Sequence, residues 1–170
     1  MRKGARKVRS PPKAAVAVAP GQRGSDTPPD RTTLARCCCT PSLVSRTRGG
    51  ARIEVELIGG RLFKHSVVAV GAAAIKAIAR VRADIYFMGV TGVHAEMGLR
   101  TSDPGEAAVK RSLSRQAAET IVLASHEKLG AVSPFVIMPL SEVDMLIVEK
   151  GSPHELIDSY RRLGLTVVAA

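Results

Sequence analysis

The segment Ala83–Arg111 reads ADIYFMGVTGVHAEMGLRTSDPGEAAVKR. Its first part, Ile85–Met88, is a short apolar run that ends at a glycine, which is typical of a β-strand buried on both faces. Its last part begins with Asp103 and Pro104, residue types preferred at the N-cap and at the first position of a helix. The segment therefore predicts a strand, a glycine-containing loop, and a helix that runs to about Ala118.

Strands and helices alternate on both sides of this segment. Hydrophobic periodicity predicts further strands over Ile53–Ile58, Ser66–Val70, Thr120–Ala124, Met145–Val148 and Leu165–Val168, and helices over 71–81 and from Ser152 to Gly164. The second of these helices repeats the capping pattern, with Ser152 before Pro153. This order is that of an α/β fold with a parallel sheet. Because ligands of such sheets bind at the carboxyl ends of strands, the loops after Met88 and Ala124 are the candidate sites.

The chain divides into two parts by composition. Residues 1–50 hold 11 of the 25 Lys and Arg residues but 2 of the 15 acidic residues, and 6 of the 10 prolines. Prolines remove backbone donors and disfavour helix, so we expect 1–50 to be a basic, Pro-rich disordered tail and 51–170 to be the folded domain. The break near residue 50 also fits upstream coding sequence that is read in a wrong frame.

The cysteines and the apolar runs bear on the setting of the chain. Cys37, Cys38 and Cys39 are consecutive, which suits neither a disulfide between them nor zinc-ligand spacing, so no metal and no cofactor are expected. No apolar run reaches the roughly 18 residues of a membrane span, and no signal-peptide core is recognisable. The chain is therefore expected in the cytoplasm.

The loop after Met88 carries three candidate binding residues. Gly92 allows close backbone approach, while Thr91 and His94 supply a hydroxyl and an imidazole that suit sugar hydroxyls or phosphate. The alternative is a flexible connecting loop with a solvent-facing His94.

Three charged residues are further candidates. Glu106 and Lys110 are spaced i, i+4 and share one helix face, where Lys110 could meet a phosphate. The alternative is a capping box at Glu106 and a surface ion pair. Lys128 follows the strand that ends at Ala124 and could reach over the same site, after a turn that Ser125 would cap. The alternative there is an ordinary strand-to-helix turn.

Five sequence motifs in order resemble the C-terminal sensor domain of DeoR-family transcriptional regulators. They are IEVELIGG at Ile53–Gly60, ADIYFMGVTG at Ala83–Gly92, EAAVKR at Glu106–Arg111, TIVLASHEKLG at Thr120–Gly130 and PLSEVD at Pro139–Asp144. The resemblance implies a Rossmann-like parallel sheet similar to that of ribose-5-phosphate isomerase, glucosamine-6-phosphate deaminase and CoA transferases. It also implies a phosphorylated sugar or related metabolite as effector. The effector-binding residues carried over are Thr91, Gly92, His94, Glu106, Lys110 and Lys128.

The sequence departs from the family pattern at its amino-terminal side. Members carry two further sheet segments before the first motif and a DNA-binding helix-turn-helix before those. Thr32–Ala35 weakly resembles a glycine-threonine loop of the first segment, but no apolar strand is recognisable ahead of it. We therefore expect a truncated domain that binds operator DNA only if a helix-turn-helix exists upstream. A missing part of the sheet would expose an edge and favour homo-oligomers.

Three functions are compatible with these observations. The first is the effector-sensing part of a regulator, which is not an enzyme. The second is a truncated relative without activity of its own. The third is an isomerase- or deaminase-like enzyme, which the fold permits but for which the loop after Met88 offers no carboxylate pair or activated base.

Overall fold

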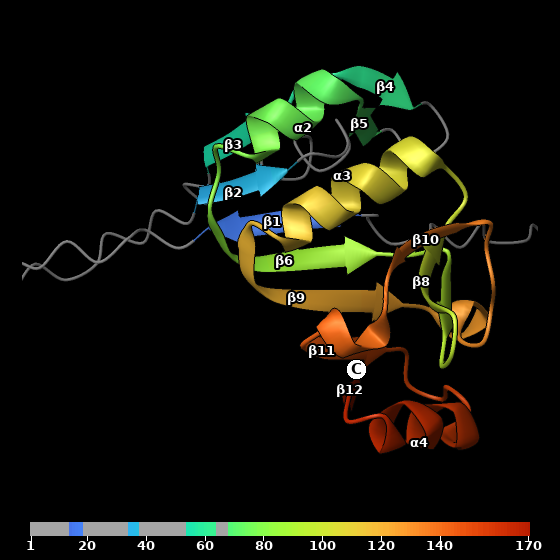
Figure 1. Cartoon of the computed structure of the whole chain (residues 1–170). Helices are drawn as coiled ribbons and strands as arrows, with labels where there is room; N and C mark the ends of the chain where they lie inside the picture. The colour runs from blue at the N-terminus through green and yellow to red at the C-terminus, as the bar shows by residue number, and fades with distance from the viewer. Residues whose placement is uncertain (1–13, 19–33, 38–53, 64–67) are drawn as a thin grey trace, which may run out of the picture.

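A computed structural model describes residues 14–18, 34–37, 54–63 and 68–170. Within these ranges, a seven-stranded sheet has the strand order β12-β11-β9-β6-β1-β2-β3 (Figure 1). Its strands are β1 Ala14–Val18, β2 Leu34–Cys37, β3 Glu54–Leu57, β6 Ala83–Gly89, β9 Ala117–Ala124, β11 Met145–Val148 and β12 Thr166–Ala169. No helix of the described residues is long and apolar enough to cross a membrane.

The parallel half of the sheet confirms the predicted α/β fold. Strands β6, β9, β11 and β12 are mutually parallel, with Phe87 opposite Ile121 and Val122 opposite Leu146. Side chains from these strands that are at most 2% exposed make the centre of the core; they include Tyr86, Met88, Val122, Leu146 and Val148. In β6 and β11 these buried residues alternate with half-buried apolar ones, so one face of the strands is fully buried and the other is partly covered. Apolar residues on both faces explain why the strands appear in the sequence as apolar runs, although the predicted burial of Ile85–Met88 on both faces is only partly met.

The other half of the sheet contains strands that the sequence does not predict. Strand β1 is antiparallel to both β6 and β2, and β2 is parallel to β3. Strands β1 and β2 lie in the range 1–50, for which we expect a disordered tail. The other residues of that range lie outside the described part of the chain, so the tail and its boundary stay predictions.

Two neighbouring helices pack beside the sheet and a third packs at its end. Helix α2 (Ala72–Ile78) contacts α3 (Pro104–Ser114), which lies along β6 and β9, while α4 (His154–Arg162) packs on β12 (Figure 1). Helix α3 ends at Ser114 and not at about Ala118 as predicted. The reason is that the Gln116 carbonyl accepts a hydrogen bond from the Ala83 amide (3.0 Å), and Ala117 already pairs with Ala83 in the sheet.

The segment after β6 is a β-hairpin and not a loop. Strands β7 (Gly92–His94) and β8 (Gly98–Thr101) pair with each other, and β10 (Phe135–Met138) pairs with β8 to complete a three-stranded sheet. Gly98 has φ +70°, and a Cβ there would lie 2.5 Å from the Met138 carbonyl oxygen. Strands of three and four residues that begin at glycines leave too little periodicity to be recognised from sequence.

Strand β10, at one edge of this small sheet, is covered at one point by a side chain of α3. The Arg111 guanidinium donates hydrogen bonds to the Val136 carbonyl (2.6 Å) and to the Ile137 carbonyl (3.3 Å). The pairing of β10 with β8 is irregular between Val136 and Met138. One arginine can therefore reach two successive carbonyls of the same strand. A separate two-stranded hairpin consists of β4 (Arg61–Phe63) and β5 (Val68–Val70).

The Tyr160 hydroxyl fastens α4 to the hairpin. Tyr160 is 1% exposed, and its hydroxyl donates to the Val93 carbonyl (2.8 Å), which also accepts from the Gly130 amide (2.8 Å). Burial raises the pKa of Tyr160 above its usual value of 10.0, against a smaller lowering by the Gly130 amide. The predicted cap of α4 by Ser152 is wrong, because the Ser152 hydroxyl donates to the Glu149 carbonyl (2.7 Å) instead.

We predict that Tyr160→Phe lowers the free energy of unfolding by about 1–2 kcal/mol at neutral pH, because the hydroxyl loses its hydrogen bond to the Val93 carbonyl and the one it accepts from the Gly130 amide. Above pH 10 this difference should shrink. A raised folded-state pKa means that the unfolded chain ionises first, so the stabilisation by Tyr160 is lost as pH rises. Urea unfolding at several pH values measures both effects. Ser159→Ala, which removes another α4 hydroxyl, should show no such alkaline trend.

Candidate functional site

The carboxyl ends of β6 and β9 face the small three-stranded sheet, and this side of the large sheet is called its carboxyl edge below. The arrows of both strands point toward β8 and β10 (Figure 1). The segment after β9 returns along the hairpin, where Leu129 forms a parallel bridge with Val93. The predicted site residues therefore lie on three elements around this edge: the hairpin, helix α3, and the segment that follows β9.

Glu106 and Lys110 form a buried ion pair at the start of α3. Lys110 Nζ lies 2.9 Å from Glu106 Oε1, and the two side chains are 2% and 0% exposed. The Thr101 hydroxyl donates to Glu106 Oε2 (2.8 Å) and is itself buried. The alternative of a surface ion pair is therefore wrong, because neither charge reaches solvent.

The predicted capping pattern at α3 is half correct. Asp103 caps the helix through a hydrogen bond that its Oδ1 accepts from the Glu106 amide (2.8 Å). Glu106 does not complete a capping box, because its carboxylate is held by Thr101 and Lys110. The same residue thus carries a cap contact on its backbone and an ion pair on its side chain.

A buried ion pair is weak evidence for stability. The loss of hydration by two charges often equals or exceeds their attraction, and apolar replacements of similar volume can be as stable. The pair between Glu106 and Lys110 therefore calls for a reason other than folding alone.

Thr91 and Gly92 fix the junction between the hairpin and the segment at 131–133. The Thr91 hydroxyl donates to the Arg100 carbonyl (3.2 Å) and lies 2.8 Å from the Ser133 hydroxyl oxygen. A Cβ at Gly92 would lie 2.3 Å from the Ala131 carbonyl oxygen. The close backbone approach that we predict for Gly92 is thus an approach to the protein's own chain.

His94 closes the turn between β7 and β8. Its Nδ1 accepts hydrogen bonds from the amides of Glu96 and Met97, both at 3.2 Å. An accepting Nδ1 places the proton of the neutral ring on Nε2, which becomes a donor. His94 is half-buried, so it is not the fully solvent-facing residue of the flexible-loop alternative.

Lys128 ends a single 3-10 turn, His126–Lys128, directly after β9, and its side chain is half-buried. Ser125 precedes this turn but does not cap it. Its hydroxyl donates to the Glu127 carboxylate instead.

Strand β8 makes hydrogen bonds both to Thr91 and to the ion pair on α3. The Arg100 carbonyl accepts from the Thr91 amide and hydroxyl, and the next residue, Thr101, donates to Glu106. Arg100 also reaches the 131–133 segment, where its Nη1 donates to the Ser133 carbonyl (3.2 Å). Sequence reasoning missed Arg100, Thr101 and Ser133, because their roles depend on a hairpin that the sequence does not predict.

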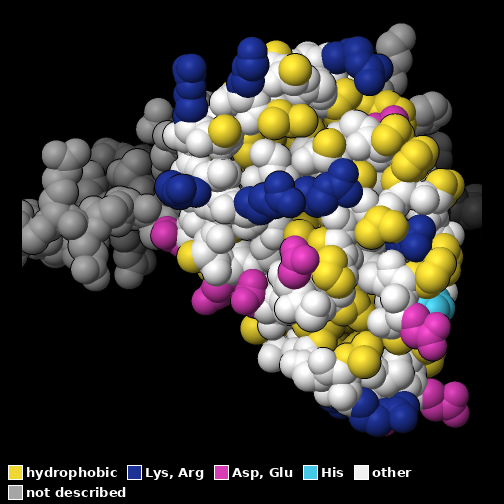
Figure 2. Space-filling model, in the orientation of Figure 1, with side chains coloured by type: hydrophobic (Ala, Val, Ile, Leu, Met, Phe, Trp, Pro, Cys, Tyr) yellow, Lys and Arg dark blue, Asp and Glu magenta, His cyan; other side chains and the backbone are white. Residues whose placement is uncertain are grey.

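A groove on another part of the molecule contains none of the six predicted site residues. It has a volume of about 330 Å³ and is lined by Ile75, Ala108, Arg111, Ser112, Arg115 and Gln116. Figure 2 shows Lys and Arg side chains in a row across this face, with apolar side chains between them. It lies along the C-terminal part of α3, away from the carboxyl edge of the sheet.

Comparison with known proteins places the chain among transcriptional regulators. Residues 30–150 match the DeoR C-terminal sensor domain. GlcR, an HTH-type transcriptional repressor of Bacillus subtilis, is 31% identical over 116 residues, which are 68% of this chain and 45% of that protein. A putative aga operon transcriptional repressor of Escherichia coli O157:H7 is 28% identical over 116 residues, 68% of this chain and 43% of that protein. FruR, an uncharacterized HTH-type transcriptional regulator of Bacillus subtilis, is 37% identical over 109 residues, 64% of this chain and 43% of that protein.

The fold and these matches define a sensor domain of a transcriptional regulator. The chain belongs to the DeoR family. The prediction that it is related to transcriptional repressors is confirmed by this membership and by the relatives. The chain spans less than half the length of the three relatives named above.

We predict that Glu106→Gln and Lys110→Met each lower the free energy of unfolding by about 3–5 kcal/mol, because each leaves a buried charge without its partner. The double variant should be less destabilised than the sum of the two, which a double-mutant cycle from urea unfolding measures. Asp158→Asn is the matched control, since it removes an exposed ion pair with Arg161 (3.5 Å) and should change stability little. Additive effects of the two buried substitutions would show that the pair is not coupled.

Proposed function

We propose that this chain is the effector-sensing part of a cytoplasmic DeoR-type regulator of carbohydrate metabolism, and that its effector is a phosphorylated sugar or a related metabolite. The observation that carries the proposal is the buried ion pair between Glu106 and Lys110 at the carboxyl edge of the sheet. Breaking the pair is costly, but apolar residues could replace both partners without loss of stability, and buried ionisable groups of this kind are often found at functional sites.

The candidate residues have complementary chemistry for such an effector. Lys110 and Lys128 supply the positive charge that a phosphate group needs, as point charges with three donors each. His94 offers Nε2–H as a donor, because its Nδ1 is engaged by the turn. Thr91 offers a hydroxyl oxygen, and Gly92 lets the hairpin approach the Ala131 carbonyl closely, which keeps Thr91 at this edge.

Sensing would follow from competition for Lys110. An effector phosphate that pairs with Lys110 competes with the Glu106 carboxylate, which also holds Thr101 at the end of β8. Binding would therefore favour an arrangement of α3 and the hairpin different from that of the free protein. A ligand shifts such an equilibrium only by the difference in its affinity for the two arrangements.

Two further parts of the proposal concern partners. The relatives are named as HTH-type transcriptional regulators or as an operon repressor, so operator DNA is proposed as a partner only of a protein in which a helix-turn-helix accompanies this domain. Association between copies of the chain is proposed through an exposed edge of the large sheet, of which β3 and β12 are the outer strands.

The proposal predicts a thermal shift with phosphorylated sugars and none with the same sugars without phosphate. At about 100 times its dissociation constant, a specific effector adds roughly 2.7 kcal/mol of stability. Lys128→Ala and His94→Ala should each weaken that binding about 10-fold or more. The exposed His154→Ala on α4 should leave it unchanged. A folded protein that shifts with no sugar phosphate would contradict the proposal.

A further inference from the structure

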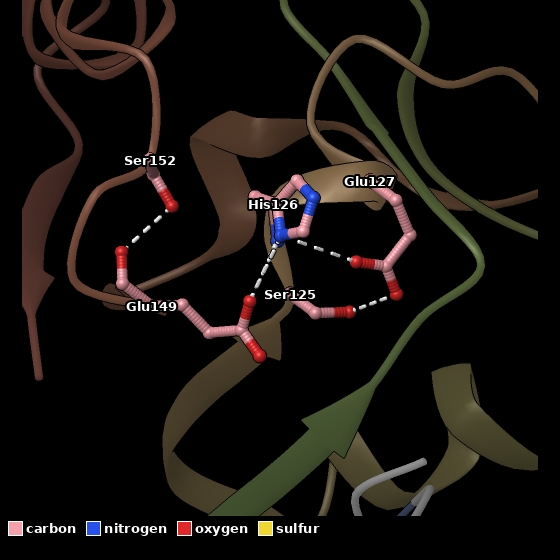
Figure 3. A network of polar contacts seen from close by, with 5 residues as sticks. All are labelled: Ser125, His126, Glu127, Glu149 and Ser152. Carbon is pink, nitrogen blue, oxygen red and sulfur yellow. Dashed lines mark hydrogen bonds and ion pairs between the residues drawn. The ribbon is translucent and has the colours of Figure 1, made fainter. Parts of the chain in front are cut away.

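A second cluster of polar side chains lies at the ends of two neighbouring parallel strands. His126 and Glu127 follow β9, and Glu149 follows β11. The last residues of these strands, Ala124 and Val148, are paired in the sheet. Adjacent strand ends thus bring the three side chains together although Glu149 lies 22 positions after Glu127 in the chain (Figure 3).

The three side chains converge on one small volume. His126 Nδ1 lies 3.1 Å from Glu149 Oε2 and 3.6 Å from Glu127 Oε2. One ligand atom from each of the three residues lies within 4.8 Å of the others. Donor atoms around a tetrahedral ion, at ligand distances of about 2.0–2.2 Å, are themselves about 3.3–3.6 Å apart. The separation of His126 from Glu127 falls in this range, and that of His126 from Glu149 is 0.2 Å shorter than its lower end, so small side-chain movements would seat an ion.

Neighbouring groups hold the cluster in place. The Ser125 hydroxyl donates to Glu127 Oε1, and Ser125 is buried. The His126 amide donates to Glu149 Oε2 (3.3 Å), and the buried Ser152 hydroxyl donates to the Glu149 carbonyl (2.7 Å). Figure 3 shows these contacts around the imidazole. Support of this kind fixes the orientation of metal ligands in proteins.

The cluster combines two acidic side chains with one imidazole on the surface. Both carboxylates already accept hydrogen bonds from neighbouring groups, Glu127 from the Ser125 hydroxyl and Glu149 from the His126 amide.

We propose that His126, Glu127 and Glu149 bind a divalent transition-metal ion, with Zn²⁺ as the best fit. One imidazole nitrogen and two carboxylate oxygens are typical zinc ligands, whereas Mg²⁺ and Ca²⁺ prefer oxygen ligands alone. The three side chains are 67%, 61% and 55% exposed, so a fourth position is open to water. The ion would replace the imidazole–carboxylate contact and cross-link the ends of β9 and β11.

Calorimetric titration with Zn²⁺ alone tests this site in the full chain. Cys37, Cys38 and Cys39 are first replaced by Ser, because thiolates also bind zinc. We expect one equivalent of zinc to bind and the melting temperature to rise with it. A large excess of Mg²⁺ should not compete.

Substitutions assign the binding to this cluster. His126→Ala and Glu149→Gln should each weaken zinc binding at least 10-fold, and circular dichroism verifies that both variants stay folded. His154→Ala and Glu142→Gln replace an exposed histidine and an exposed glutamate elsewhere, and should bind zinc like the parent. No bound equivalent, or equal binding by parent and His126→Ala, overturns the proposal.

The metal site does not rest on the proposed effector. Zinc is titrated without any sugar phosphate, and effector binding is measured with EDTA present. Either result can therefore fail without affecting the other.

Discussion

The Glu106 carboxylate sets the arrangement of the carboxyl edge. It lies where water does not reach, so its two oxygens must find partners within the protein. Lys110 supplies one partner from the next turn of α3, and Thr101 supplies the other from the end of β8. Helix and hairpin are therefore fixed to each other by a single side chain. An apolar residue at this position would need neither contact.

The β7–β8 hairpin also holds the other segments of the carboxyl edge by hydrogen bonds to its backbone carbonyls. The Arg100 carbonyl accepts hydrogen bonds from Thr91, and the Val93 carbonyl accepts hydrogen bonds from the Gly130 amide and the Tyr160 hydroxyl. Helix α4, far along the chain, is thereby tied to the same small sheet. At the carboxyl edge, backbone carbonyls of the hairpin thus each accept two hydrogen bonds and hold neighbouring parts of the chain together.

The sequence predicts the parallel strands well because both of their faces carry apolar residues, one face fully buried and the other half-buried, which leaves an uninterrupted apolar run, as in Ile85–Met88 and Met145–Val148. It predicts α3 because Asp103 and Pro104 mark its start. It fails at the hairpin, where short strands begin or end at Gly92 and Gly98 and have no recognisable period. The family motifs point to Glu106 and Lys110, but not to their burial or to Thr101. Those depend on contacts between segments that only the folded chain brings together.

The arginine that covers β10 has a consequence for how copies of the chain can meet. A strand added by another chain needs free carbonyl groups along the edge it joins. On β10, the Val136 and Ile137 carbonyls already accept from Arg111. An incoming strand would have to displace a guanidinium as well as follow an irregular register. The exposed apolar side chains of Phe135 and Val136 thus lie on an edge that resists β-augmentation.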